Sequence, residues 1–276
     1  MLPCDHAVMW HQPFLDGIAF IRARYIEHTF PRHTHEYFAI GVIEEGYQQF
    51  LLGRQLYRTP AGGMFVVNPG EVHTGESATR SGFTYRTFYP SLATLEAITG
   101  EITEKSQPFP LFTTPVIDDP DLVRIFLRMH HALETPRSPL EAESHVHQAI
   151  AHLVIRQAPS HPVPRPLGYE RREVARVRAF LDEHYDENIT LQQLATYARL
   201  SPFYLNRVFR KEVGMPPYAY LENRRIQRAQ QLLQADHPIA EVAFQTGFSS
   251  QSHFTTCFKR YLGVPPAHYA RLRKSA

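Results

Sequence analysis

Residues 195–220 and 243–269 share one pattern, and this repeat is the feature that most limits how the chain can fold. The recurring positions, 49 residues apart, are Phe209, Gly214, Pro217 and Tyr220 in the first copy and Phe258, Gly263, Pro266 and Tyr269 in the second. Duplication at such a period is typical of one supersecondary unit used twice. Because each copy has the pattern of a helix-turn-helix, the sequence predicts two neighbouring contacts with double-stranded DNA.

The positive charge of the chain is concentrated in the part that holds the repeat. Residues 170–276 contain 16 basic residues (Lys and Arg) and 10 acidic residues (Asp and Glu), whereas residues 1–169 contain 13 basic and 17 acidic residues. A polyanionic partner requires such a basic region. The two cysteines, Cys4 and Cys257, cannot form a four-thiolate zinc site, and no apolar run approaches the roughly 18–20 residues of a membrane span. We therefore expect a cytoplasmic protein that has no membrane contact.

A proline-rich segment separates the two halves of the chain. The stretch APSHPVPRPLG contains four prolines, which prevent a helix from continuing and favour an extended linker. We place this linker at 158–169, between an amino-terminal domain at 1–157 and a carboxyl-terminal domain at 170–276. Aromatic and β-branched stretches in residues 18–89 predict an all-β sandwich or barrel of antiparallel strands, and helical spacing in residues 119–157 predicts two helices after it.

The carboxyl-terminal domain is predicted to be all-α, with about seven helices and a helix-turn-helix in each copy of the repeat. In the first copy, the capping-box spacing of Thr190 and Gln193 predicts a short helix over residues 191–198. Ser201 can cap the next helix, because Pro202 suits a first position that needs no N–H partner. The residues that helical spacing places on its outward face are Phe203, Tyr204, Asn206, Arg207, Arg210 and Lys211.

The second copy repeats this arrangement with different outward residues. Gly247 predicts the turn, and Ser249 or Ser250 predicts the cap of the helix that follows. The residues that face outward or lie at the edge are Gln251, Ser252, His253, Thr255, Thr256, Lys259 and Arg260. A helix over residues 217–234, on the order of 25 Å long, joins the copies. This helix can place both copies of the repeat on one side of a DNA duplex, where major-groove faces recur about every 34 Å.

Residues 170–276 resemble the DNA-binding domain of the AraC/XylS-type transcription regulators, and GFSSQSHFTTCFKRYLGVPPAHY is similar to the second signature of that family. The resemblance implies a sequence-specific activator, with RNA polymerase as a partner. It implies base contacts by Phe203, Asn206, Arg207, Gln251, Ser252, His253 and Thr256. It implies DNA-backbone contacts by Ser201, Tyr204, Arg210, Lys211, Ser250, Lys259 and Arg260. This division agrees with the chemistry, since Arg and Asn can make two hydrogen bonds to one base edge.

Two motifs of the amino-terminal domain resemble the paired motifs of the cupin barrel. They are His33-Thr-His35 and the later PGEVH, which ends at His73. In metal-binding cupins a Glu follows the His pair, but Ala39 and Ile40 hold its positions here. The three histidines could still bind a divalent ion, or they could line a pocket. The resemblance to the regulators favours a pocket, so we expect that the protein has no cofactor. If a metal ion does bind in this domain, the three histidines are its candidate ligands.

In the regulators that the chain resembles, the cupin-like domain binds a small effector. A set of donors with aromatic walls would suit a small polar or anionic molecule. The candidates are Arg24, His35, Tyr37, Glu71, His73, Tyr85 and Arg86. Strand alternation puts Tyr85 and Arg86 on opposite faces and leaves open which face points inward. Alternatively, Arg24 and Arg86 simply pair with acidic residues.

Two functional classes follow from these patterns. In the first, an effector changes how the tethered DNA-binding domain, or a homodimer formed through residues 119–157, meets an operator. In the second, the chain is a metal-dependent cupin enzyme that carries a DNA-targeting domain. The sequence offers no constellation of nucleophile, base and orienting group, and the cupin Glu is missing. We therefore expect a ligand-responsive activator rather than an enzyme.

Overall fold

The computed structural model describes residues 5–12, 15, 18–103, 109, 111–135, 138–159, 162–164, 166–168, 170–262 and 264–274. Cys4, Gly263 and parts of the predicted linker lie outside these residues. The chain forms two compact units. The first comprises Met1–Thr135 and His145–Arg165, and the second comprises Pro136–Ser144 and Pro166–Ala276.

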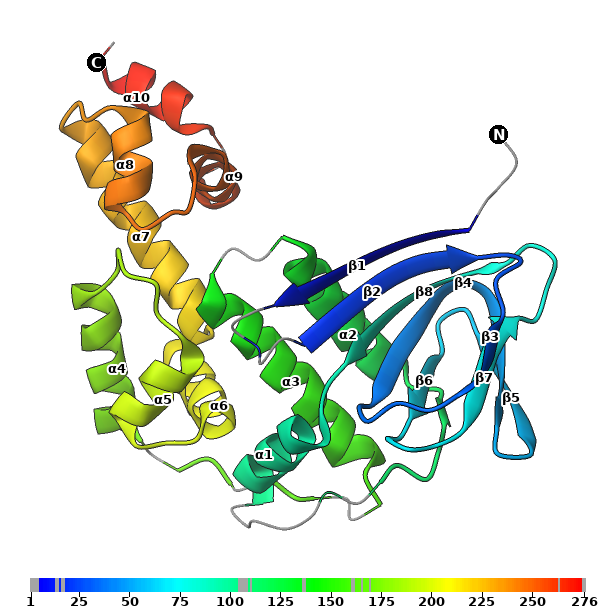
Figure 1. Cartoon of the computed structure of the whole chain (residues 1–276). Helices are drawn as coiled ribbons and strands as arrows, with labels where there is room; N and C mark the ends of the chain where they lie inside the picture. Colours follow the sequence, from blue (N-terminus) through cyan, green and yellow to red (C-terminus); the bar gives the residue numbers. More distant parts are fainter. Residues whose placement is uncertain are drawn as a thin grey trace. The chain divides into compact units, whose positions relative to one another are not determined.

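The first unit is built on antiparallel strands. They are β1 (His6–Gln12), β2 (Ile18–Tyr25), β3 (Phe30–His33), β4 (Ala39–Leu52), β5 (Gln55–Pro60), β6 (Met64–Val67), β7 (His73–Ser77), β8 (Phe83–Tyr89) and β9 (Val116–Ile117). The long β4 belongs to two layers, because residues 39–46 pair with β6 and β8 while residues 47–52 pair with β5 and β7 (Figure 1). The predicted β-rich architecture is confirmed, although the sheet does not close into a barrel.

A glycine allows β4 to pass from one layer to the other. Gly46 has a φ of +74°, in the left-handed region that favours glycine. A Cβ atom at this position would lie 2.2 Å from the carbonyl oxygen of Gly82, so a side chain could not be accommodated. The two layers can therefore fold toward each other and enclose a space between them.

Three helices complete the amino-terminal half of the chain: α1 (Leu92–Thr103), α2 (Pro120–Glu134) and α3 (Pro139–Gln157). α2 and α3 are the two helices predicted over residues 119–157. Asp119 caps α2 by accepting a hydrogen bond from the Leu122 N–H at 3.1 Å. α2 packs on the sheet, with the rings of Phe126 and Phe88 5.4 Å apart between centroids. The sequence prediction missed α1, β1 and β9.

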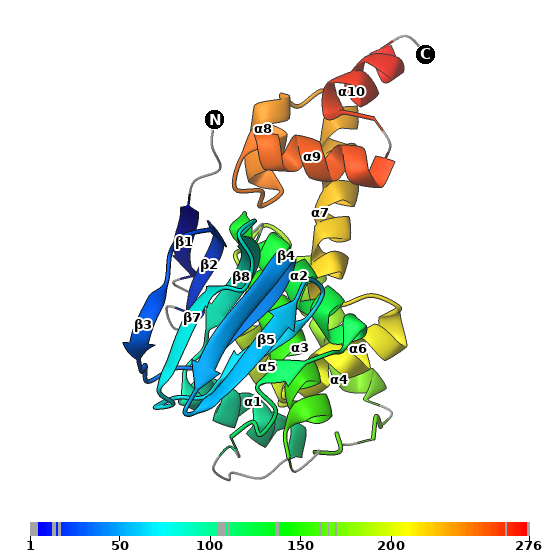
Figure 2. The ribbon, with the colours of Figure 1, turned by 90° about the vertical axis from the view of Figure 1, so that its right-hand side faces the viewer.

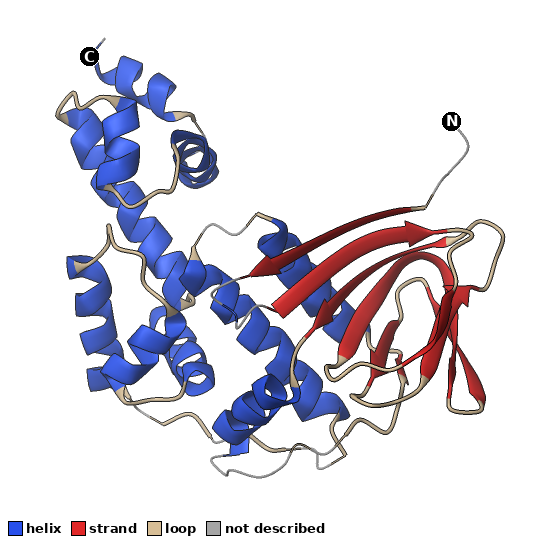
Figure 3. Cartoon of the chain, viewed as in Figure 1, coloured by secondary structure: helices blue, strands red, loops and turns tan. Residues whose placement is uncertain are grey.

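The described residues of the second unit form helices and loops only (Figure 3). Besides the first residues of α3, they are α4 (Arg171–Glu183), α5 (Leu191–Ala198), α6 (Pro202–Val213), α7 (Pro217–Gln234), α8 (Ile239–Gln245), α9 (Gln251–Leu262) and α10 (Pro266–Lys274). This agrees with the prediction of about seven helices. Among the described residues, no helix has both the length and the apolar character needed to cross a membrane.

α7 joins two separate hydrophobic cores within this unit. Leu221, near its start, belongs to a core with residues of α4, α5 and α6. Ile226 and Leu233, further along, belong to a core with residues of α8 and α9. Figure 2 shows α8, α9 and α10 gathered around the carboxyl-terminal end of α7. The two copies of the repeat are therefore two small domains that share one helix.

Candidate nucleic-acid interface and ligand cavity

Local capping fixes the first helix-turn-helix, formed by α5 and α6. The Thr190 hydroxyl accepts a hydrogen bond from the Gln193 N–H, and the Gln193 side chain accepts one from the Thr190 N–H. The turn places Arg199 in the left-handed region, with a φ of 57°. The Ser201 Oγ then accepts from the Tyr204 N–H at 3.2 Å and caps α6. All of these caps were predicted from the sequence.

Two residues predicted on the outward face of α6 are buried. Phe203 and Tyr204 are only 8% and 5% exposed, so their predicted outward positions are wrong. α6 packs against both α4 and α5, which widens its buried side. The Tyr204 hydroxyl accepts from the Gly168 N–H and donates to Glu170, so its hydrogen bonds are made within the unit. Phe203 instead lies under Arg207, whose guanidinium carbon is 5.3 Å from the ring centroid.

The remaining outward face of α6 is polar and basic. Arg210 and Lys211 are exposed, and Asn206 and Arg207 are half-buried beside them. The contact with Phe203 restricts the guanidinium of Arg207, which lowers the entropy lost when it binds. Asn206 and Arg207 therefore stay the candidates for base contacts from this helix.

The second recognition helix, α9, presents a different set of side chains. Ser250 caps it by accepting from the His253 N–H at 3.1 Å, which decides between the two predicted serines. Its exposed residues are Gln251, Ser252, Thr256, Lys259 and Arg260. His253 is half-buried at the edge of this face, with its ring against Phe248. Arg260 forms an ion pair with Glu222, so part of its charge is compensated within the unit.

The two capping serines can still contact DNA. Each uses an oxygen lone pair to accept from a backbone N–H, at Ser201 from Tyr204 and at Ser250 from His253. The hydroxyl hydrogen of a serine is not used by such a cap and can be donated to a phosphate oxygen. The predicted backbone contacts by Ser201 and Ser250 are therefore compatible with their capping roles.

Arg225 links the two helix-turn-helix domains from inside the unit. It is only 4% exposed and donates from Nε to the Tyr185 carbonyl at 2.7 Å and from Nη2 to the Glu187 carbonyl at 2.8 Å. Its guanidinium also lies over the ring of Phe248, at 5.9 Å from the centroid. Burial lowers the pKa of Arg225 to about 10, so it stays charged at neutral pH. The α4–α5 loop is thus tied to α7 and to the second helix-turn-helix.

Three arginines of α7 make different contacts. Arg225 is buried and donates to backbone carbonyls. Arg224 pairs with Asp182 at 2.7 Å, and Arg228 donates to Gln231 at 2.9 Å.

The α4–α5 loop also presses against the turn of the second helix-turn-helix. Gly247 has a φ of +76°, and a Cβ there would lie 2.7 Å from the Asp186 carbonyl oxygen. Gly214, with a φ of +83°, has open space around its Cβ position. Gly247→Ala should lower the free energy of unfolding of this unit by about 2 kcal/mol, and Gly214→Ala by about 1 kcal/mol, since only the first adds a clash to left-handed strain. Urea denaturation followed by circular dichroism measures both losses, and equal losses would contradict the close contact with Asp186.

A cavity of about 180 Å³ lies between the two strand layers of the first unit. Its lining residues are Phe30, His33, His35, Tyr37, Ala39, Gln48, Phe50, Phe65, Val67, His73, Thr74, Gly75, Tyr85, Thr87 and Tyr89. The alternation of β8 is now assigned, because Tyr85, Thr87 and Tyr89 face the cavity whereas Arg86 and Phe88 contact α2. Burial raises the pKa of Tyr85 and of Tyr89, so both hydroxyls are neutral at physiological pH.

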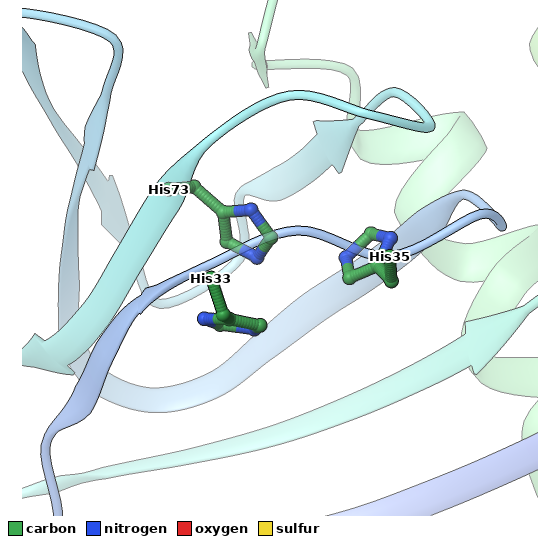
Figure 4. Close-up of side chains that lie close together, drawn as sticks. All are labelled: His33, His35 and His73. Atoms are coloured by element: carbon green, nitrogen blue, oxygen red, sulfur yellow. The ribbon is translucent and has the colours of Figure 1, made fainter.

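Three histidines converge on one wall of this cavity (Figure 4). His33 ends β3 and is the cross-strand neighbour of His73 at the start of β7, and His35 follows two residues after His33. Their ring centroids are 4.2 Å apart for His33 and His73, 4.8 Å for His35 and His73, and 6.0 Å for His33 and His35. Burial lowers the pKa of both His35 and His73, which favours neutral imidazoles.

Three of the predicted effector residues do not line the cavity. Arg24 pairs with Glu45 at the edge of the sheet, at 3.1 Å. Arg86 is buried on the opposite face, where it bonds to Glu44, Glu134 and His130. The Glu71 carboxylate turns back to accept from the Asn68 N–H at 3.0 Å. The pairing interpretation is therefore correct for the two arginines, although their partners are acids that the sequence did not single out.

His35, Tyr37, His73 and Tyr85 do line the cavity, together with polar residues that the sequence prediction did not name as candidates. Two of these, Gln48 and Thr87, are buried with no hydrogen-bond partner for Oε1 and Oγ1 among the described residues. The sequence does contain an indication of their role, since an amide or hydroxyl among the inward-facing residues of an apolar strand is unusual. This indication can be used only when the face of the strand that points inward is known.

The two units define a class of protein in which a ligand-binding domain is joined to a double helix-turn-helix. Residues 17–150 match the family model of the AraC-like ligand binding domain, and residues 194–272 match that of a helix-turn-helix domain. The chain is 32% identical over 235 residues to the uncharacterized HTH-type transcriptional regulator YbfI of Bacillus subtilis. The aligned residues make up 84% of this chain and 84% of YbfI. The chain therefore belongs to the AraC family of transcription regulators.

Other relatives match the carboxyl-terminal part. The HTH-type transcriptional activator AarP of Providencia stuartii is 30% identical over 112 residues, which is 38% of this chain and 83% of AarP. The DNA-binding domain of the global transcriptional factor AdpA, solved in complex with a target DNA, is 34% identical. That match covers 37% of this chain and 94% of the AdpA domain, with a TM-score of 0.36.

Proposed function

We propose that this regulator is an activator controlled by a small polar effector that binds in the cavity of the first unit. The observation that carries this proposal is a set of buried polar atoms on the cavity wall. Gln48 Oε1, Thr87 Oγ1 and His35 Nε2 have no hydrogen-bond partner among the described residues. Leaving such an atom unpaired costs about 1–3 kcal/mol, so a ligand that pairs with them gains affinity. Arg24 and Arg86 lie elsewhere, so among the described lining residues no side chain of fixed charge favours an anion.

The experiment is a measurement of operator affinity for the full chain with and without small polar compounds, on sites found by genome-wide mapping of bound DNA. Genes beside those sites narrow the choice of compounds. Gln48→Leu and Thr87→Val should weaken the response to an effective compound, because each removes a hydrogen-bonding group from the cavity. Gln192→Leu, an exposed residue of α5, serves as the control. A response that survives both cavity variants would contradict the proposed binding place.

On the DNA side, the two recognition helices are proposed to read different sequences. Arg207→Ala should relax the sequence preference in one half of the operator at a cost of about 1–3 kcal/mol, because a guanidinium reads a guanine edge. Lys259→Ala should weaken all sequences alike and reduce the salt slope by about one, because an exposed ammonium neutralises a phosphate. Binding to a library of operator variants at several salt concentrations separates the two results. Identical behaviour of both variants would remove the assignment.

Further partners are part of the same proposal. Activation implies contact with RNA polymerase in the cytoplasm, and AarP, which is named an activator, supports this role. A homodimer is proposed through residues 119–157. Leu122, Phe126 and Val154 are buried within the protomer, and Arg156 is the one exposed residue of α3, so the partner would meet the polar outer face of α2. Light scattering that shows a monomer with and without effector would eliminate the dimer.

The second candidate function is a metal-dependent enzyme, and the three clustered histidines are the observation that favours it. YbfI and AarP are named transcription regulators, which supports the proposal that this chain has no catalytic activity. Metal analysis of the purified protein distinguishes the two functions. A stoichiometric, redox-active iron would support the enzyme instead.

A further inference from the structure

The tautomers of the three cavity histidines are set by the backbone. The Nδ1 atoms of His33, His35 and His73 lie 2.8, 2.6 and 2.9 Å from the carbonyl oxygens of Pro31, Tyr37 and Glu71. A carbonyl oxygen can only accept a hydrogen bond, so each Nδ1 carries the proton. In a neutral imidazole the lone pair is then on Nε2. All three rings are thus held with the same nitrogen available as a ligand.

These anchored rings converge closely enough to share one ion. Each histidine offers a nitrogen, and the three nitrogens lie within 4.8 Å of one another. Tetrahedral coordination with Zn–N bonds of about 2.0–2.1 Å requires nitrogens about 3.3 Å apart, so small side-chain rotations would complete the geometry. His35 Nε2 is buried without a partner among the described residues, as expected for a ligand nitrogen. Hydrogen bonds from Nδ1 to carbonyl oxygens are the usual support of metal-bound imidazoles.

From this geometry we infer that His33, His35 and His73 form a site for one divalent transition metal ion of the zinc type in the ligand cavity. Imidazole ligands favour such ions over Mg²⁺ or Ca²⁺, which prefer oxygen. Three protein ligands leave a fourth position open toward the cavity. No carboxylate lines the cavity among the described residues, so the bound ion keeps its positive charge and attracts a ligand with an anionic oxygen. The ion supplies the fixed charge that Arg24 and Arg86 do not.

Zinc titration of the chelator-treated full chain by calorimetry tests the site. We expect one Zn²⁺ per chain, with no heat from Mg²⁺. His35→Asn and His73→Asn should each weaken binding at least tenfold. An Asn side-chain amide can still donate to the Tyr37 or Glu71 carbonyl, so these variants remove the ligand and keep its hydrogen bond. His131→Asn, an exposed residue of α2, is the matched control and should leave zinc binding unchanged.

A second measurement does not depend on any variant. Co²⁺ added to the wild-type chain should give the visible absorption of a four-coordinate ion, and Zn²⁺ should abolish it. Zinc binding that is unchanged in His35→Asn and His73→Asn, or the absence of the cobalt spectrum, would overturn the site.

The regulatory role of the ion rests on the proposed function. Operator affinity with Zn²⁺ and with a chelator tests that role separately, because metal binding is measured without DNA. Zinc binding with no change in operator affinity, even with anionic compounds present, would overturn the regulatory role and leave the metal site in place.

Discussion

Arg225→Met should lower the free energy of unfolding of the helical unit by about 3 kcal/mol, because it removes two hydrogen bonds from a charged donor at about 1.5 kcal/mol each. The Tyr185 and Glu187 carbonyls would then lose their donor. Met has nearly the same length, so the loss is not due to a large cavity. Chemical denaturation of the full chain at neutral pH measures the change.

Arg225→Met should also weaken binding to a full operator more than it weakens the binding of either recognition helix to its own half of the operator. Arg225 ties the α4–α5 loop to α7 and lies over Phe248 of the second helix-turn-helix. A looser connection lets the two recognition helices move relative to each other, so simultaneous binding loses effective concentration. Affinity for a full operator should fall about tenfold or more, whereas binding to each half should change little.

Arg224→Met is the matched control for this prediction. The neighbouring Arg224 has the same charge and length, but it pairs with Asp182 at the surface. Exposed ion pairs contribute about 0–1 kcal/mol, so this variant should stay close to the wild type. Equal losses in the two variants would show that the charge, and not the buried contacts of Arg225, determines stability.

Lowering the pH from about 6.5 to about 5 should destabilise the strand-containing unit by about 2 kcal/mol through His130 alone. Burial, together with the neighbouring Arg86, lowers the pKa of His130 to about 4. Arg86 is always charged and donates to Nδ1 at 3.2 Å, while His130 Nε2 donates to the Thr87 carbonyl. Protonating Nδ1 would remove the first bond and place two cations together beside Glu44 and Glu134.

The sign follows from the protons bound in each state. An unfolded histidine has a pKa near 6.5, so between about pH 6.5 and pH 4 the unfolded chain binds more protons than the folded chain. The stability contributed by neutral His130 is therefore present above pH 6.5 and is lost as the pH falls. His145, whose pKa burial lowers to about 4, adds a loss in the same range.

A glutamine variant separates the two histidines. His130→Gln can accept from Arg86 and donate to the Thr87 carbonyl, but it does not titrate. The dependence of stability on pH between 6.5 and 5 should therefore fall by the share of His130, and the rest is due to His145, His35 and His73, whose pKa values burial also lowers. Thermal unfolding at a series of pH values measures it. An unchanged pH dependence in this variant would contradict the neutral state of His130.

The helical unit was largely predictable because its signals are local. The capping box at Thr190, the cap at Ser201 and the glycine turn at Gly247 act within a few residues, so the sequence states them directly. The burial of Phe203 and Tyr204 could not be read in this way. It depends on two neighbouring helices packing against α6 at once, and helical spacing describes only one buried side.

The strand-containing unit was less predictable for the same physical reason. β1 is an edge strand with mostly exposed residues, so it lacks the alternation of a half-buried strand. α1 buries Leu95, Ile98 and Ile102 at helical spacing, a signal that was present in the sequence and was missed. The side chains of β8 point in turn to the two faces of the sheet, and this alternation does not depend on what covers each face. Only the positions of α2 and the second strand layer decide which of these side chains face the cavity.

The sequence by itself determined the class of this protein, because two copies of one capped helical pattern specify a double DNA-binding unit through local interactions. The tertiary structure alone decided which polar groups are used inside it. Arg86 and Arg225 became buried structural residues, and His33, His35 and His73 became a convergent set with Nε2 available. Such roles depend on carbonyl oxygens and side chains that are distant in sequence, and only folding brings those groups within hydrogen-bonding distance.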